Sequence, residues 1–384
     1  MAVTFSGGGY AGVVINLIQP TPPGYYLWSW GYNSYGQIGD GTSGTGTHKS
    51  SPVQIGALSN WLSIAAGNYH KISVKTDGSM WTWGYNPSGA LGLSDATSRS
   101  SPVQVGALTN WSSNADSFDG GGYHTLAVKT DGALWGWGNN YRGVLGLGDE
   151  TNRSSPVQVG ALTNWLKVSC GGYRTSLAIK TNNTLWTWGR NNYGNLGLGD
   201  TNNRSSPVQV GSLTNWSTVS AGQYHMAAVK TDGTLWTAGS NFYGELGNGT
   251  SGNGTEKSSP VQVGSLTNWS SVSSGTYINL AVKTDGTLWS WGFNTQGQLG
   301  DGSTVDKSSP IQVGALTNWS RSSAGYSSAA IKTDGTIWTW GDAGFGVLGL
   351  GNTTNRSSPT QVGALNVWTT IVHTAYATVA IGYY

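Results

Sequence analysis

The sequence predicts an all-β protein, a seven-bladed β-propeller of four-stranded blades closed by pairing of N- and C-terminal strands. Two sequence markers recur seven times at intervals of about 50 residues, a period typical of propellers and solenoids. Each repeat contains about four strand-like segments, which is the content of one propeller blade. The two ends of the chain carry complementary parts of one blade. We therefore predict an N-terminal arm or linker over 1–23 and the propeller over 24–384.

The two markers are a Trp-Gly-x-Asn-like turn and the tripeptide Ser-Ser-Pro. The turn begins at Trp30, Trp83, Trp137, Trp188, Ala238, Trp291 and Trp340. The prolines of the tripeptide are Pro52, Pro102, Pro156, Pro207, Pro260, Pro310 and Pro359. Because both markers keep their order and spacing in every copy, the repeat cannot be a chance similarity.

Within a repeat, alternating side chains predict strands and Asp-Gly pairs predict the turns between them. The segment Thr234-Leu235-Trp236-Thr237 alternates large and small residues, as a half-buried strand does. An Asp-Gly pair is a strong signal for a hairpin turn, and Asn182-Asn183 in one copy still tolerates left-handed backbone. The pairs are Asp77-Gly78, Asp131-Gly132, Asp232-Gly233, Asp285-Gly286 and Asp334-Gly335. No helical periodicity is present.

The chain ends predict how the ring closes. The final segment 379–384 resembles the strand that precedes Lys-Thr-Asp-Gly in other copies, but no partner strand follows it. The missing strand, Leu27-Trp28-Ser29-Trp30, lies near the N-terminus. Pairing the two removes the exposed edges that an open array would carry. We therefore expect deletion of either end to reduce stability far more than its length suggests.

Composition excludes several classes of protein. Charged residues make up 9% of the chain, well below the roughly 25% of an average soluble protein. The formal net charge of +2 is spread over the repeats without a basic cluster, so no nucleic-acid partner is expected. The apolar run 11–18 is too short to span a bilayer, and no basic residue precedes it to form a Sec signal. We expect a soluble protein without membrane insertion, cytoplasmic before assembly. The single Cys170 allows no internal disulfide.

The repeat resembles that of a known family. The run Leu-Trp-x-Trp-Gly-x-Asn-x-x-Gly-x-Leu-Gly-x-Gly, followed by Pro-x-x-Val, is similar to the repeat of the regulator of chromosome condensation family over residues 24–384. The resemblance implies a seven-bladed propeller whose closing blade is shared between the termini. Similar propellers serve as nucleotide-exchange factors, enzyme inhibitors and adhesion modules, so fold alone does not assign a function. The near-identical repeats look most like bacterial and phage members. The chain lacks the basic tail of the eukaryotic exchange factor, and none of that protein's functional residues is transferred.

No catalytic, cofactor or metal site is predicted. Three of the five histidines, His70, His124 and His225, follow a recurring Tyr, and the same position holds Arg174, Ile278, Ser327 and Ala377 in other copies. We interpret this position as a tolerant turn site rather than a metal ligand or base, because no His-x-x-x-His or Cys-x-x-Cys spacing supports zinc. Short acidic loops lack the alternating carboxylates of calcium loops.

Recurring aromatic residues are interpreted as packing. Sevenfold recurrence of the Trp after Asn-like positions argues for contacts between blades rather than a sugar-binding belt. The recurring Tyr is ambiguous, because its polar tip often ends at water. These residues are Tyr69, Tyr123, Tyr173, Tyr224, Tyr277, Tyr326 and Tyr376.

Function is expected where the copies differ. Extra residues at 114–119 include Phe118, which we predict to be exposed, and the loops after Trp-Gly vary in Tyr, Phe and Arg. Such residues on loops over a rigid frame are typical of binding surfaces, although plain surface drift explains the variation equally well. The candidate partner-binding residues are Val13, Val14, Ile15, Leu17, Ile18, Phe118, Tyr141, Arg142, Arg190, Tyr193, Phe242 and Tyr243.

The arm completes the functional hypothesis. An apolar segment followed by prolines, outside a closed domain, suits docking on a protein partner. We predict a non-catalytic structural or binding propeller, most simply a virion-associated tail, fibre or capsid-decorating protein, or a component of a bacterial surface assembly. Its arm would dock it and its loops would recognise a host surface protein or glycan. The alternative is a regulatory or inhibitory propeller that binds a soluble enzyme or GTPase.

Overall fold

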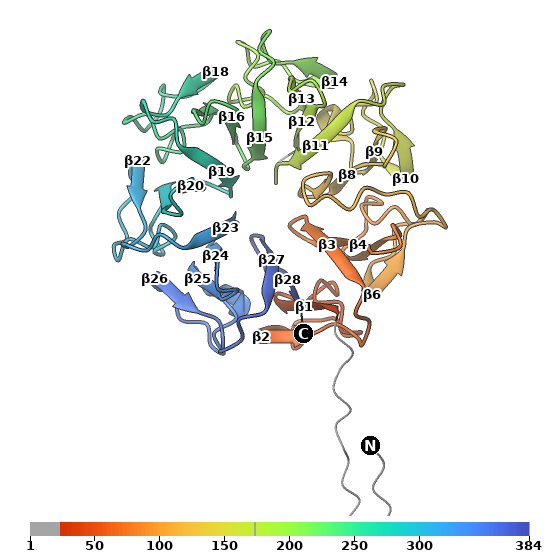
Figure 1. Cartoon of the computed structure of the whole chain (residues 1–384). Helices are drawn as coiled ribbons and strands as arrows, with labels where there is room; N and C mark the ends of the chain where they lie inside the picture. The colour runs from red at the N-terminus through yellow and green to blue at the C-terminus, as the bar shows by residue number, and fades with distance from the viewer. Residues whose placement is uncertain (1–23, 173, 384) are drawn as a thin grey trace, which may run out of the picture.

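The computed structural model describes residues 24–172 and 174–383 and confirms the predicted fold class. Seven four-stranded antiparallel sheets stand side by side in a closed ring around a central channel (Figure 1). We number the blades along the chain from β3–β6 as blade 1 to β23–β26 as blade 6. Blade 7 combines β27 and β28 with β1 and β2. The candidate residues Val13, Val14, Ile15, Leu17 and Ile18 lie outside the described residues.

Each blade has four positions from the channel to the rim. The innermost strands are β3 (Trp61–Ala66), β7 (Phe118–Gly120), β11 (Trp165–Cys170), β15 (Trp216–Ala221), β19 (Trp269–Ser274), β23 (Trp319–Ala324) and β27 (Trp368–His373). The second strands are β4 (His70–Lys75), β8 (His124–Val128), β12 (Thr175–Lys180), β16 (His225–Lys230), β20 (Ile278–Lys283), β24 (Ser328–Lys332) and β28 (Ala377–Tyr383). The third strands are β5 (Met80–Gly84), β9 (Leu134–Gly138), β13 (Leu185–Gly189), β17 (Leu235–Gly239), β21 (Leu288–Gly292), β25 (Ile337–Gly341) and β1 (Tyr25–Gly31).

The outermost strands carry the Ser-Ser-Pro marker, and the structure gives its physical reason. They are β6 (Arg99–Gln104), β10 (Arg153–Gln158), β14 (Arg204–Gln209), β18 (Lys257–Gln262), β22 (Lys307–Gln312), β26 (Arg356–Gln361) and β2 (Lys49–Gln54). Proline has no N–H to donate and is therefore tolerated on an edge strand. A proline in the free edge of every blade hinders pairing with another chain, which an unprotected edge invites.

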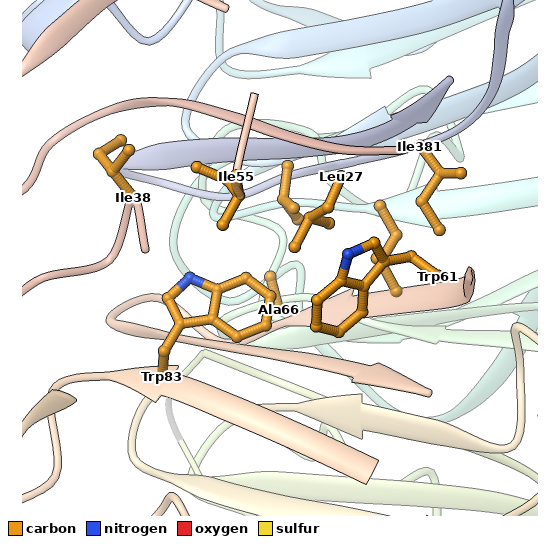
Figure 2. Close-up of a cluster of buried hydrophobic side chains, with 9 residues drawn as sticks. Leu27, Ile38, Ile55, Trp61, Ala66, Trp83 and Ile381 are labelled. Carbon is orange, nitrogen blue, oxygen red and sulfur yellow. The ribbon is translucent and has the colours of Figure 1, made fainter. Parts of the chain in front are cut away.

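The core lies between the blades, and the recurring tryptophans build it. At the junction of blades 7 and 1, Leu27 and Ile381 pack against Trp61 and Trp83 (Figure 2). The Trp83 indole also donates a hydrogen bond to the backbone carbonyl of Gln37 in blade 7, at 3.0 Å. Trp111, Trp165, Trp216, Trp269, Trp319 and Trp368 are buried in the corresponding positions of the other junctions. The prediction that these rings pack blade against blade is confirmed.

Ring closure follows the predicted pairing of the chain ends. Strand β1 pairs with β28 in unbroken antiparallel register from Tyr25↔Tyr383 to Gly31↔Ala377. Strand β28 also pairs with β27 on its other side. The N-terminal β1 and β2 thus form the outer half of a blade whose inner half comes from the C-terminus.

The prediction that Phe118 is exposed is wrong. Its side chain is 1% exposed and packs in the core between blades 1 and 2, with Trp111 and Trp137 among its neighbours. The extra residues form a turn in which Ser117 donates a hydrogen bond to the Asn114 carbonyl, and the innermost strand resumes at Phe118. Phe118 pairs with Ala127 in the register that Val168 takes with Ala178 in the next blade, so the insertion leaves its side chain facing the core.

Truncation of Phe118 is therefore expected to destabilise the fold, whereas truncation of an exposed Phe is not. We expect Phe118→Ala to lower the free energy of unfolding by about 3–5 kcal/mol, because it removes a buried ring and leaves a cavity. Phe242→Ala, at a position 51% exposed, should change it by less than about 0.5 kcal/mol. Denaturant unfolding followed by Trp fluorescence measures both, and equal effects would contradict this assignment.

Candidate functional site: an aromatic and arginine-bearing face

One face of the ring collects most of the residues that break the repeat. We call it the top face: it carries the turns between the first and second strands of each blade and the loops between the third and outermost strands. The recurring Tyr lies in the first type of turn, and the variable loop residues lie in the second. The opposite, bottom face carries the Asp-Gly turns and the Gly-Ala-Leu loops.

The tyrosines near the channel mouth stack on one another. Around blades 7, 1 and 2, the ring of Tyr69 lies 5.0 Å from Tyr376 and 5.3 Å from Tyr123, with nearly parallel planes in both pairs. Across the channel, Tyr224 and Tyr277 stack at 5.8 Å. Burial raises the pKa of the Tyr69 phenol well above its ordinary value, so it stays neutral and can both donate and accept hydrogen bonds.

Between these two groups the top face carries three arginines on tyrosine rings. We call Tyr141, Arg142, Arg174, Arg190 and Tyr224 the arginine–tyrosine group. The guanidinium carbons of Arg142 and Arg174 lie 4.7 and 4.6 Å from the centre of the Tyr141 ring. That of Arg190 lies 5.9 Å from the centre of the Tyr224 ring. All three distances are within the range of cation–π attraction.

The group joins other candidate residues into one exposed surface. Tyr141, Tyr193 and Phe242 are 43%, 42% and 51% exposed, whereas Arg142, Arg190 and Tyr243 are half-buried. Tyr193 contacts Tyr224 at 5.3 Å and Phe242 contacts Tyr243 at 4.8 Å. The structure therefore brings these predicted residues onto the top face of consecutive blades, and excludes Phe118 from it.

The loops that carry these residues are fixed from beneath by a recurring Asn. The side-chain oxygen of Asn140 accepts a hydrogen bond from the Leu145 amide at 2.9 Å, and its amide group donates to the Asp149 carbonyl at 2.9 Å. Asn191 and Asn241 make the corresponding bonds in the following loops. The side chains above are thus displayed on ordered backbone.

The prediction that Arg174 occupies the repeat position of His70, His124 and His225 is wrong. Thr175, and not Arg174, pairs with Gly189 in the way that His124 pairs with Gly138. Arg174 is one extra residue in the turn, with a left-handed backbone φ of 75°. This extra residue is visible in the sequence as a one-residue increase between Tyr173 and the following strand. Arg174 and Tyr224 are the members of the site that sequence reasoning missed.

The histidines of this repeat position are buried, so their interpretation as a tolerant turn site is wrong. His70 shares a hydrogen bond with the Thr125 hydroxyl at 2.9 Å, and His225 with the Asn279 side chain at 3.0 Å, in each case across a blade junction. Burial lowers the pKa of His70 to about 3, so its imidazole is neutral at ordinary pH. Within residues 24–172 and 174–383, no three His, Cys, Asp or Glu side chains are placed to hold a metal ion.

The central channel is lined by hydroxyl groups that connect the blades. Ser220 and Ser273 each accept a hydrogen bond from a backbone amide of the next blade, at 2.8 and 2.9 Å. Asp119 takes this role in blade 2, accepting from the Cys170 amide at 2.8 Å. Its enclosed position raises the pKa of its carboxyl group to about 7. The channel contains a cavity of about 450 Å³. Asp119 lies on its wall, and its hydrogen bond to the Cys170 amide joins blade 2 to blade 3.

The bottom face has exposed aliphatic side chains that recur in every blade. It bears seven exposed leucines, one in each Gly-Ala/Ser-Leu loop: Leu58, Leu108, Leu162, Leu213, Leu266, Leu316 and Leu365. These residues follow the repeat, whereas the top-face residues depart from it. In the described part of the chain, no helix has the length and apolar character needed to cross a bilayer.

These features define the class of protein as a closed seven-bladed propeller with one aromatic, arginine-bearing face. The family model for the regulator of chromosome condensation (RCC1) repeat matches residues 26–74, 77–128, 131–178, 182–229, 232–282, 285–331 and 334–381. The chain therefore belongs to the RCC1 repeat family.

Relatives with curated names share the repeat within longer chains. The chain is 31% identical over 293 residues to the ultraviolet-B receptor UVR8 of Arabidopsis thaliana, covering 72% of this chain and 63% of UVR8. It is 31% identical over 168 residues to the probable E3 ubiquitin-protein ligase HERC3 of Homo sapiens, covering 43% of this chain but only 16% of HERC3. The chain thus spans less than two thirds of the length of these relatives.

Solved structures show the same fold at low identity. Prp20p of Saccharomyces cerevisiae superposes with a TM-score of 0.79 at 18% identity, covering 95% of this chain and 92% of Prp20p. Human WBSCR16 superposes with a TM-score of 0.80 at 20% identity, covering 93% and 98% of the two chains. At these identities the similarity establishes the fold alone.

Proposed function

We propose that this chain is a non-catalytic binding propeller that recognises a protein partner through its top face. One observation carries the proposal: exposed aromatic side chains and arginines that break the repeat gather on the top face of consecutive blades. Tyr and Arg are the residue types enriched at the centres of protein interfaces. Prp20, which has the same fold, has known binding properties towards Gsp1p and histones and forms a complex with Kap60, which supports a protein as partner.

The rigidity of the surface also supports binding. The loops carrying Tyr141, Tyr193 and Phe242 are held by Asn140, Asn191 and Asn241 as described above. A surface ordered before association loses less conformational freedom on binding, and this improves affinity without adding contacts. Catalysis would need groups of different chemistry held together, whereas the exposed groups here are aromatic rings and guanidiniums.

A role in an assembly is a further part of the proposal. Residues 1–23, with Val13 to Ile18, would dock the propeller on a virion or bacterial surface assembly, while the top face binds a surface protein or glycan of the host. We expect removal of 1–23 to leave the propeller folded but unable to join its assembly. Unchanged incorporation, measured by co-sedimentation with the particle, would contradict docking by the arm.

The second candidate is a regulatory propeller that binds a soluble enzyme or GTPase. The similarity in fold to Prp20, whose binding to Gsp1p has been described, favours it as the alternative. The identity of the captured partner separates the two: a particle component or host surface molecule supports the first, and a soluble enzyme or GTPase supports the second.

Site-specific photocrosslinking tests which face binds. A benzophenone amino acid is placed at Phe242 on the top face or, as the matched control, at Leu213 on the bottom face, which is similarly exposed at 47%. We expect a crosslinked protein from the cells that produce the chain only with the probe at 242. Crosslinking at 213 alone, or equal crosslinking at both, would contradict the top-face assignment.

A further inference from the structure

Seven of the eight arginines of the chain fall into two sets, and the eighth, Arg321, lies on β23 at the channel wall. Those that follow the repeat begin outermost strands, and several pair with an Asp four residues earlier, as Arg153 does with Asp149 at 2.6 Å. Arg142, Arg174 and Arg190 do not follow the repeat, and they meet at one place on the top face. The Arg190 amide donates a hydrogen bond to the Arg174 carbonyl at 2.8 Å, which holds the two residues together.

The ring of Tyr141 brings two of these guanidiniums together. Both Arg142 and Arg174 lie over its ring, at 4.7 and 4.6 Å. The planar guanidinium of Arg can contact an aromatic ring and also form paired hydrogen bonds, which the ammonium group of Lys cannot do. Such planar donors match the two oxygens of a carboxylate. The ring therefore gathers two positively charged, planar groups within one small area.

The backbone beneath them is held in an uncommon conformation. Arg142 and Arg174 have φ values of 66° and 75°, in the left-handed region that non-glycine residues rarely adopt. Phe345, which occupies the position of Arg142 in the corresponding turn of blade 6, has a φ of 57°, so this turn adopts the same backbone conformation with a different side chain. Residues held in such sparsely populated conformations cluster at binding sites.

We infer that the arginine–tyrosine group binds the carboxylates of an acidic segment in a protein partner. The inference rests on the proposed function and names the chemistry of its partner. The two guanidiniums on Tyr141 take acidic side chains of the segment through paired hydrogen bonds. Arg190, at the neighbouring ring of Tyr224, extends the positive surface towards Tyr193 and Phe242, which offer apolar contact to the rest of the segment.

Two other anionic ligands fit the group less well. Nucleic acids are bound through many phosphate contacts, whereas this site offers three cations in a chain of net charge +2. Acidic sugars are commonly held by an aromatic ring that stacks on the sugar, and the ring of Tyr141 already contacts two guanidiniums. An acidic peptide needs only the carboxylate contacts and the adjacent apolar surface.

Calorimetry with short homopeptides tests the inference on the full chain. Glutamate and glutamine homopeptides of equal length are titrated at low ionic strength into the wild-type protein, the double variant Arg142→Asn/Arg174→Asn, and the control Arg153→Asn. Asn tolerates left-handed backbone, so the double variant should keep its fold, which circular dichroism verifies. We expect the wild type and the control to bind glutamate peptide alike, and the double variant to bind at least about tenfold more weakly.

A second variant separates charge from geometry. Arg142→Lys/Arg174→Lys retains both positive charges but loses the planar donors, so we expect an affinity between those of the wild type and the Asn variant. Absence of glutamate-peptide binding to the wild type, equal binding of the glutamine peptide, or unchanged affinity in the Asn variant would overturn the inference. Tighter binding of polygalacturonate or oligothymidylate than of the glutamate peptide would overturn it in favour of a glycan or nucleic acid.

The two experiments distinguish failure of the carboxylate inference from failure of the proposed function. If the probe at Phe242 captures a protein whose binding is unchanged by Arg142→Asn/Arg174→Asn, the carboxylate inference falls and the top-face function stands. If the peptide binds through the arginines but the probe at Phe242 captures no protein, the carboxylate site stands and the proposed function falls.

Discussion

Removal of residues 377–384 is expected to abolish the cooperative fold of the whole propeller. The deletion removes β28, which is hydrogen-bonded to β1 on one side and to β27 on the other. Val379 and Ile381 are fully buried in the core between blades 7 and 1, where they pack with Trp61 and Trp83. Without β28 the ring is open, and β1 and β27 each have an unpaired edge. The resulting loss of folding free energy should exceed the roughly 5–15 kcal/mol that stabilises a typical domain.

Thermal unfolding followed by circular dichroism and dye binding measures this effect. We expect the truncated chain to show no cooperative transition and to bind hydrophobic dyes at room temperature. Deletion of 1–23 is the matched control, because it removes more residues but none of the described strands. A truncated chain that melts cooperatively near the temperature of the full chain would show that blade 7 does not hold the ring closed.

Replacement of Lys71 is expected to have the second largest effect, in the stabilising direction. The Lys71 side chain is fully buried, and its ammonium group lies 3.5 Å from both the Gly67 carbonyl and the Thr374 hydroxyl. Burial lowers the pKa of Lys71 from its ordinary 10.5 to about 7. At the equivalent position of blade 4 the chain has Met226, which is buried without charge. We expect Lys71→Met to raise the free energy of unfolding at neutral pH by about 2–4 kcal/mol.

The pH dependence gives this prediction a second readout. Between pH 7 and 10.5 the unfolded chain binds a proton at Lys71 that the folded chain has released. The free energy of unfolding of the wild type should therefore rise with pH over this window, and the full destabilisation should be present below pH 7. Lys71→Met should reduce that rise. Burial also lowers the pKa of stacked lysines such as Lys75, so the quantity to compare is the difference in slope between the two proteins.

Lys167→Met serves as the control for Lys71. Lys167 pairs with Asp116 at 3.1 Å on a more accessible part of the channel wall. A partly exposed ion pair of this kind contributes at most about 1 kcal/mol, so Lys167→Met should not reproduce the stabilisation expected of Lys71→Met. Urea titrations across this pH range measure all three proteins. Equal stability and equal slope in wild type and Lys71→Met would show that Lys71 is not held neutral by burial.

The fold could be predicted from the sequence because every signal for it is local and repeated. The Asp-Gly pairs set the hairpins, and the alternation in segments such as 234–237 set the strands. The complementary ends, Leu27 to Trp30 and the final strand, set the closure. The two markers that recur seven times outweigh irregularities such as Ala238, which stands where other blades have Trp.

The candidate site was only partly predictable, since it depends on where the strand register resumes after extra residues. The extra residues before Phe118 looked like an exposed loop, but the strand register resumes at Phe118 and turns its ring into the core. The sequence order places Arg174 directly after the recurring Tyr, as it does His124, although Thr175 takes the place of His124 in the sheet. In strands, a shift of one residue moves a side chain to the opposite face, so counting along the chain cannot assign such positions.

The sequence by itself thus determined the seven blades, the closing blade and the packing role of the tryptophans, because these depend on periodicity and on turn chemistry. Only the tertiary structure decided that Arg142, Arg174 and Arg190 meet around two tyrosines, and that Lys71 is fully buried between blades 7 and 1. The physical reason is that contacts between blades depend on ring geometry, which joins residues far apart in the chain. A periodic sequence specifies the ring but not which departures from the repeat come together on its face.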